Sequence, residues 1–138
     1  MSYYNASSPS VLEKIIASAS YLTMGFVGFI WLILAVFTKN TLRPFLRYHV
    51  YQSVFLSIIY FLLSTFISLL FGILGYIPFL KKLVGMIAFF FNVPVIGHLS
   101  LISALIMTLI LYLAISSFTG KFSYIPWVSD VINYNVRR

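Results

Sequence analysis

The sequence predicts an all-α, polytopic membrane protein, and three observations support this fold class. Apolar residues make up 62% of the 138 residues. Charged residues make up only 8%, whereas a typical soluble domain has about 25%. The charges also leave three long stretches uncharged, with 24, 33 and 38 residues at 15–38, 48–80 and 83–120. A transmembrane helix needs about 20 apolar residues, so the chain is expected to cross the membrane several times.

We expect four transmembrane helices in a single membrane domain of residues 1–138, the third helix being short or re-entrant. The expected spans are about 15–37, 48–75, 79–95 and 99–118, followed by an interfacial tail at 120–138. The first span is too long for a signal peptide and lacks the small residues of a cleavage site. Gly72, Gly75 and Pro78 are expected to end the second span, and Pro94 the third, because these residues interrupt helices.

Basic and aromatic residues mark the expected membrane boundaries. Segment 40–47 is predicted to form an interfacial turn into the second span, with Pro44 in the first helical turn. Arg47 and Tyr48 are expected in the headgroup layer, Tyr48 as an aromatic anchor. The further expected interfacial anchors are Arg43, Lys81, Lys82, Lys121 and Trp127.

The distribution of positive charge predicts the orientation, because lysine and arginine favour the cytoplasmic side or its organellar equivalent. With four spans, both termini share a side that carries six basic residues. The opposite side then carries three, which are Lys39, Arg43 and Arg47. Both termini are therefore expected on the cytoplasmic or stromal side. With three spans, the same charges would place only the C-terminus there.

Composition argues against several kinds of chemistry. The chain has no cysteine, which excludes disulfides, thiol catalysis and cysteine-ligated clusters. The net charge of +7 is spread over the membrane boundaries, which favours contact with anionic headgroups over nucleic acid. The two acids, Glu13 and Asp130, lie outside the expected spans, so no intramembrane charge marks a proton or ion pathway. We expect no enzyme, no metal site and no cofactor.

Small and hydroxyl-bearing residues share one face of the second span. They fall within about 100° of arc at 100° per residue, and they are Ser53, Ser57, Ser64, Ser68 and Gly72. Such a face favours close helix packing. Alternatively, it forms the wall of a polar groove along which a hydrophilic segment lies. A weaker stripe on the first span is a candidate packing partner and consists of Ala17, Ser20, Gly28 and Ala35.

A motif before the second span carries a family resemblance. Residues 43–53 read RPFLRYHVYQS, in which Arg47, His49 and Gln52 stand at fixed spacing. Further matching segments are 19–22 (ASYL), 120–121 (GK), 125–126 (IP) and 129–131 (SDV). With these residues, the chain resembles the twenty-kilodalton subunit of the chloroplast inner-envelope translocon, the Tic complex, and its relatives in cyanobacteria and red-algal plastids. The resemblance covers about residues 15–132, and Ser53 stands where the family has alanine.

The resemblance implies a core membrane subunit of a protein-import translocon with both termini in the stroma. It implies other translocon subunits and precursor polypeptides as partners, within the plastid inner envelope or a cyanobacterial or bacterial inner membrane. It carries no catalytic residue, and it assigns no role to Arg47, His49 or Gln52.

Two alternative functions remain open from the sequence. The broken segment Asn92-Val93-Pro94 is of the kind that forms binding sites in small-solute channels and transporters. A structural or assembly factor of another membrane complex would have much the same sequence. A chain of this size is too small to enclose a pore for a polypeptide alone, so the translocon hypothesis requires partner subunits or further copies.

Overall fold

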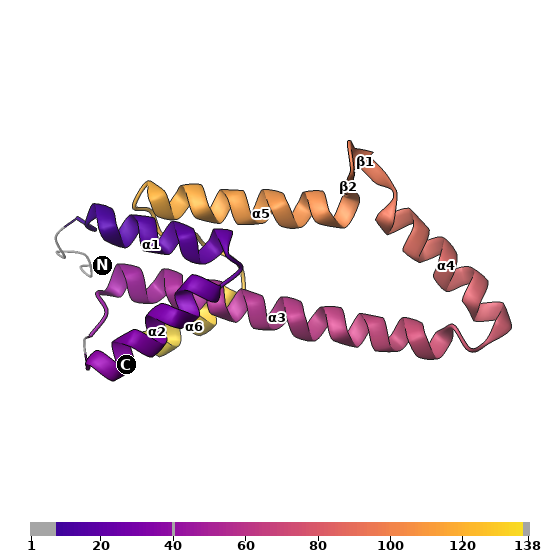
Figure 1. Cartoon of the computed structure of the whole chain (residues 1–138), viewed down its shortest axis with the longest axis horizontal. Coiled ribbons are helices and arrows are strands. Elements are labelled where there is room, and N and C mark those ends of the chain that lie inside the picture. The colour runs from indigo at the N-terminus through magenta and orange to yellow at the C-terminus, as the bar shows by residue number, and fades with distance from the viewer. Residues whose placement is uncertain (1–7, 40, 137–138) are drawn as a thin grey trace. The chain divides into compact units, whose positions relative to one another are not determined.

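The computed structural model describes residues 8–39 and 41–136, and most of this chain is helical (Figure 1). In chain order the elements are α1 (Val11–Leu22), α2 (Phe26–Thr38), α3 (Pro44–Leu74), α4 (Pro78–Asn92), β1 (Pro94–Ile96), β2 (Leu99–Ser100), α5 (Leu101–Phe118) and α6 (Val128–Val136). The all-α expectation is confirmed apart from the short β1–β2 hairpin. The chain divides into two compact units, a terminal unit of residues 1–58 and 110–138 and a middle unit of residues 59–109.

Helices α1 and α2 form a hairpin where the sequence predicted one span over 15–37. After α1 ends, Met24 and Gly25 have φ angles of 50° and 86°, a left-handed backbone that glycine adopts without steric cost. The chain reverses there, and α2 packs back against α1 (Figure 1). With 12 and 13 residues, neither helix reaches the 17 or so residues of the shortest crossing helices. The expected first span is therefore wrong, because the segment returns to the end from which it starts.

Two described helices, α3 and α5, are long and apolar enough to cross a membrane. They have 31 and 18 residues, and the mean hydropathy over an 18-residue stretch of each is 2.4 and 2.3. Pro44 is the first residue of α3, as predicted, since the first helical position needs no intrahelical N–H. The helix therefore begins before the expected span at 48–75. These two helices indicate association with a membrane, whereas the expected set of four transmembrane helices is not confirmed.

Helix α4 occupies the place of the expected third span at 79–95. It ends at Asn92, just before Pro94, as predicted, and it begins at Pro78, which the sequence predicted only as an end of the preceding helix. Its 15 residues fall short of the length that a crossing helix needs. The antiparallel pair β1–β2 then leads into α5, whose first residue is Leu101.

The terminal unit contains three apolar clusters that join elements far apart in the sequence. The first packs Ile16 and Ala17 of α1 on Phe45, Leu46 and Val50 of α3. The second joins Tyr21 of α1 to Leu113 and Ala114 of α5, and the third joins Tyr48 of α3 to Val128 and Ile132 of α6. The first two turns of α3 therefore lie at the centre of this unit, with α1 and α6 packed on them, and α5 packs on Tyr21 of α1.

The middle unit has no such core. None of the side chains that the structure describes there is buried. Three consecutive residues of α3, Phe61, Leu62 and Leu63, are 69%, 60% and 55% exposed, and successive residues point 100° apart around a helix. An apolar surface that extends around a helix in this way needs lipid or another chain to cover it.

Candidate functional site

The interior of the terminal unit is unusually polar. Among the described residues, nine polar residues are buried beside eleven apolar ones. Burying a polar group is costly unless it is hydrogen-bonded, and the side chains here satisfy one another. We define the polar cluster as the six hydrogen-bonded side chains of Tyr21, Tyr48, His49, Gln52, Ser123 and Ser129. Because it contains two of the three motif residues, it is the candidate functional site.

Helix α3 presents three of the six side chains from one face. Tyr48 and Gln52 are four residues apart and therefore lie 40° apart around the helix, and His49 lies 100° from Tyr48. Tyr48 is 4% exposed, and His49 and Gln52 are completely buried. The spacing of the motif thus turns a tyrosine, a histidine and a glutamine toward the interior of the unit together.

Gln52 is the centre of the polar cluster. Its Oε1 accepts hydrogen bonds from the Tyr21 hydroxyl at 2.6 Å and from the Ser123 hydroxyl at 3.1 Å. Its Nε2 donates to the Ser123 carbonyl and to Ser129 Oγ, both at 3.3 Å. A glutamine amide offers two donor and two acceptor positions, so Gln52 uses all four. In doing so it joins α1, α3 and the segment after α5.

His49 packs against Gln52's neighbours through hydrogen bonding and ring contacts. Its Nδ1 lies 2.9 Å from the Tyr21 hydroxyl oxygen. Because that hydroxyl has a single proton and gives it to Gln52 at 2.6 Å, Nδ1 is the donor in this contact. Phe122 stacks on the imidazole, with ring centroids 5.8 Å apart. The buried Nε2 has no well-aligned hydrogen-bond partner among the described residues, although the backbone of Lys121 lies beside the ring.

Tyr48 fixes the segment after α5 to α3. Its hydroxyl lies 2.8 Å from the Ser123 carbonyl oxygen and 2.8 Å from Ser129 Oγ. Ser129 Oγ also accepts from the backbone N–H of Ile125 at 2.8 Å, which closes the turn before α6. The expectation that Tyr48 is a headgroup anchor is therefore wrong, because its hydroxyl is satisfied inside the protein.

Two further contacts strengthen the unit around the polar cluster. The Ser18 hydroxyl of α1 donates to the Ala114 carbonyl of α5 at 2.6 Å and lies 3.1 Å from Ser117 Oγ. On the other side of α1, the hairpin approaches α3 so closely that a Cβ on Gly28 would lie 2.8 Å from Ser53 Oγ. Small residues therefore allow the helices to approach, and hydroxyls join them.

The structure separates the residues that the sequence singled out. His49 and Gln52 belong to the polar cluster, whereas Arg47 is half-buried and places its guanidinium 5.6 Å from the centroid of the Tyr51 ring. On the hydroxyl face of α3, Ser53 is buried and Ser57 half-buried. The rest of that face is exposed and consists of Ser64, Ser68 and Gly72. The expected anchors are all exposed, namely Arg43, Lys81, Lys82, Lys121 and Trp127.

The chemistry of the polar cluster is hydrogen bonding between neutral groups. The two carboxylates lie elsewhere: Glu13 faces Arg43, and Asp130 accepts from the Tyr124 hydroxyl at 3.2 Å, which raises the pKa of Tyr124. No group of three or more histidine or acidic residues gathers into a metal site in the described part of the chain. Apart from His49 Nε2, the buried side-chain polar atoms of this network are hydrogen-bonded, and such a network fixes the register of the helices that it joins.

Sequence reasoning missed most of the partners of His49 and Gln52. Tyr21 and Ser129 lie within segments that resemble the family, but the sequence does not mark them as partners of the motif, and it does not single out Ser123, Ser18 or Ser117. No protein-family model matches the chain, and no curated protein or solved structure is significantly similar to it. The likeness to the Tic subunit family therefore rests on these short motifs.

A matched pair of tyrosines tests the polar cluster. Tyr48→Phe is expected to lower the free energy of unfolding by about 0.5–1.5 kcal/mol, because it removes the hydroxyl that bonds to Ser123 and Ser129 inside the protein. Tyr51→Phe, three residues further along α3, removes the hydroxyl of a side chain that is 39% exposed and is expected to change stability by less than about 0.5 kcal/mol. Unfolding in mixed micelles, followed by circular dichroism, gives both values. Equal losses would contradict the assigned role of Tyr48.

Proposed function

We propose that the chain is a core membrane subunit of a protein-import translocon in the plastid inner envelope, where it helps to form the path for unfolded precursor proteins. The observation that supports this best is the hydroxyl face of α3. Ser53 packs inside the terminal unit, but Ser64 and Ser68 are exposed and hydrogen-bond to no other described element. A Cβ on Gly72 would meet no atom within 4 Å.

Only a few kinds of group can contact a hydroxyl-lined helix face favourably inside a membrane. Within the hydrocarbon layer, polar groups are stabilised by other protein segments or by water rather than by lipid. An extended precursor carries backbone N–H and C=O groups along its whole length, and these groups can bond to serine hydroxyls whatever the precursor's sequence. The exposed half of the face therefore suits a path wall that accepts many different polypeptides.

The surface of the middle unit favours an assembly over a lone chain. Its described side chains are exposed or half-buried, and many are large and apolar. One such unit does not surround a polypeptide. We therefore propose that partner subunits or further copies of the chain complete the path and cover part of this surface.

The positive charges support an orientation with both termini in the stroma. Seven of the nine basic residues precede α3, lie in its first turn or follow α5, and only Lys81 and Lys82 lie between the two helices. If α3 and α5 each cross once, all seven share the side of the termini, because the α1–α2 hairpin returns to its starting end. This division of seven to two is more uneven than the six to three expected for four spans. It favours the stromal or cytoplasmic side for the termini.

Site-specific photo-crosslinking tests the proposal. A crosslinking residue at position 68 of α3 is expected to capture an arrested precursor in native membranes. The matched control is position 66, because Phe66 lies at a similar depth but 160° from Ser68 around the helix and is 59% exposed. We expect precursor adducts at position 68 and lipid or subunit adducts at position 66.

Co-purification from native membranes in mild detergent distinguishes the remaining functions. Recovery of inner-envelope import subunits together with precursor adducts would support the translocon role. A different membrane complex, with no adduct at position 68, would instead identify an assembly factor of that complex. A chain that purifies alone and carries a small solute across liposomes would contradict the proposal.

A further inference from the structure

A cavity of about 550 Å³ lies in the terminal unit between the α1–α2 hairpin and the start of α3. Its volume falls within the range of about 300–1,000 Å³ that is typical of small-ligand sites. The polar cluster contributes none of its lining residues. The cavity is therefore a separate site, and the inference drawn from it does not depend on the proposed translocon role.

The polar residues of the cavity lining all lie toward one end, together with Leu12 and Leu42. Its polar lining comes from the ends of the three helices and consists of Ser10, Glu13, Thr38, Thr41 and Arg43. Its deeper apolar lining includes Ile16, Trp31 and Leu46. Ile16 is six residues beyond Ser10, and Trp31 is seven residues before Thr38, which places each about 9–10 Å further along its helix. One end of the cavity is therefore polar and basic, and the other is apolar.

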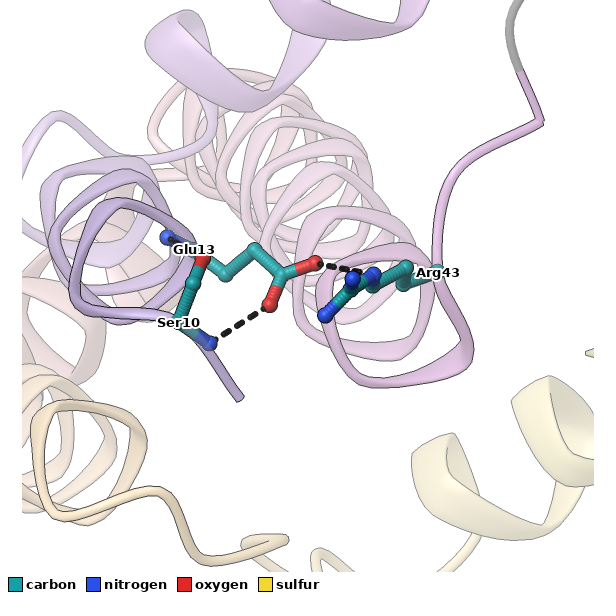
Figure 2. A network of polar contacts seen from close by, with 3 residues as sticks. All are labelled: Ser10, Glu13 and Arg43. Carbon is teal, nitrogen blue, oxygen red and sulfur yellow. Dashed lines mark hydrogen bonds and ion pairs between the residues drawn. The ribbon is translucent and has the colours of Figure 1, made fainter. Parts of the chain in front are cut away.

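An ion pair shapes the polar end. The Glu13 carboxylate accepts a hydrogen bond from the Ser10 backbone N–H at 2.8 Å, and its other oxygen lies 3.6 Å from Arg43 Nε (Figure 2). The Glu13 side chain is 11% exposed, and the Arg43 side chain is 59% exposed. Only Nε of Arg43 takes part in this pair. The two terminal nitrogens of the guanidinium are thus free, within the described chain, to bind a further anion at the cavity mouth.

We propose that this cavity binds one acyl chain of an anionic phospholipid, whose phosphate is held by Arg43. The apolar depth suits the acyl chain, and a guanidinium matches the geometry of phosphate oxygens. Lys39 and Arg47 flank the mouth in sequence, so its surroundings are basic even though Glu13 is present. The Glu13 carboxylate is already bonded and is nearly buried, so it offers little to the ammonium group of a zwitterionic lipid.

The chain has a built-in reporter for this site, because Trp31 lines the cavity and Trp127 is the only other tryptophan. In a Trp127→Phe background, brominated acyl chains that enter the cavity quench Trp31 fluorescence. The protein is reconstituted into phosphatidylcholine vesicles with a small fraction of brominated phosphatidylglycerol or, separately, brominated phosphatidylcholine. We expect the apparent affinity for brominated phosphatidylglycerol to be about fivefold higher than that for brominated phosphatidylcholine. This is the effect typical of one basic residue near a membrane surface.

Two pairs of variants assign this preference to the cavity. Arg43→Gln is expected to abolish the fivefold preference, whereas Arg47→Gln, which changes a nearby arginine outside the cavity lining, is expected to keep most of it. Ala35→Phe fills the cavity and is expected to reduce quenching by both lipids. Its control, Val36→Phe, changes the next residue, which is 76% exposed and does not line the cavity.

Three results would overturn the proposal. They are equal quenching by the two lipids in the Trp127→Phe protein, an unchanged preference when Arg43→Gln is added, and identical quenching in Ala35→Phe and Val36→Phe. The first or the third would mean that Trp31 meets only bulk lipid, and the second would mean that Arg43 does not hold the phosphate. For Arg43→Gln, Arg47→Gln and Ala35→Phe, a near-native distance between spin labels on Leu12 and Val36 shows that the hairpin remains folded. In Val36→Phe, which replaces a labelled position, an unchanged circular dichroism spectrum and unfolding transition show the same.

Discussion

Replacing Gln52 with leucine is expected to destabilise the terminal unit by about 3–5 kcal/mol. Leucine is close to glutamine in size, but it makes none of the four hydrogen bonds of the amide. The hydroxyls of Tyr21 and Ser123 would then be buried without their acceptor, and the cost of such orphaned groups exceeds the net value of the lost bonds. Because Ser123 and Ser129 fix the segment after α5, this segment should also become accessible to protease.

Unfolding in mixed micelles gives the loss of stability, and limited proteolysis gives the release of residues 121–127. The control is Asn92→Leu, which also removes an amide, but one that is exposed and, among the described residues, bonds only to Ala88 of its own helix. Its effect is expected to stay below about 0.5 kcal/mol. If Gln52→Leu were as stable and as protease-resistant as Asn92→Leu, the polar cluster would not hold the segment after α5.

Several boundaries of the fold could be predicted because single residues determine them. Pro44 and Pro78 each begin a helix, and α4 ends two residues before Pro94. Proline acts through its own ring and its missing N–H, so its effect is local and can be recognised without knowledge of the rest of the chain. Hydropathy likewise identified α3 and α5 as apolar enough to cross a membrane.

The hairpin could not be predicted from hydropathy. Residues 15–37 are uncharged and mostly apolar, and a sliding average does not distinguish one 23-residue helix from two shorter helices that fold back. The local signal is Gly25, which combines a positive φ with a close approach to α3: a Cβ there would lie 2.9 Å from the Ser53 carbonyl oxygen. That approach depends on tertiary packing, so the glycine alone did not indicate a reversal.

Only the residues that α3 contributes to the candidate site could be predicted from the sequence. The motif identified His49 and Gln52, but their partners Ser123 and Ser129 follow more than 70 residues later. Serine is common in this chain, and nothing in the sequence distinguishes a serine that bonds to Gln52 from one that faces lipid. Arg47 belongs to the same motif, yet the structure places it outside the polar cluster, where its guanidinium lies by the Tyr51 ring.

The two helices of the α1–α2 hairpin are expected to lie close together in a bilayer. Spin labels on Leu12 and Val36, which are 64% and 76% exposed, would lie about 36 Å apart in one continuous helix. In the hairpin their neighbours line the same cavity, so a distance well under 36 Å is expected from pulsed electron paramagnetic resonance in bilayers. A single population near 36 Å would restore the expected span over 15–37 and remove the cavity.

Gly25→Val should disturb this distance more than any other single change in the hairpin. Valine at a positive φ is strongly disfavoured, and its Cβ would also clash with the Ser53 backbone, for a combined cost of roughly 3 kcal/mol or more. We expect a broad or lengthened distribution between positions 12 and 36, because relief of the strain requires the hairpin to leave α3. Gly85→Val is the control, since a Cβ on Gly85 would meet nothing within 4 Å and the short distance should persist. A short distance in both variants would mean that contacts within the hairpin, and not the glycine turn on α3, determine the reversal.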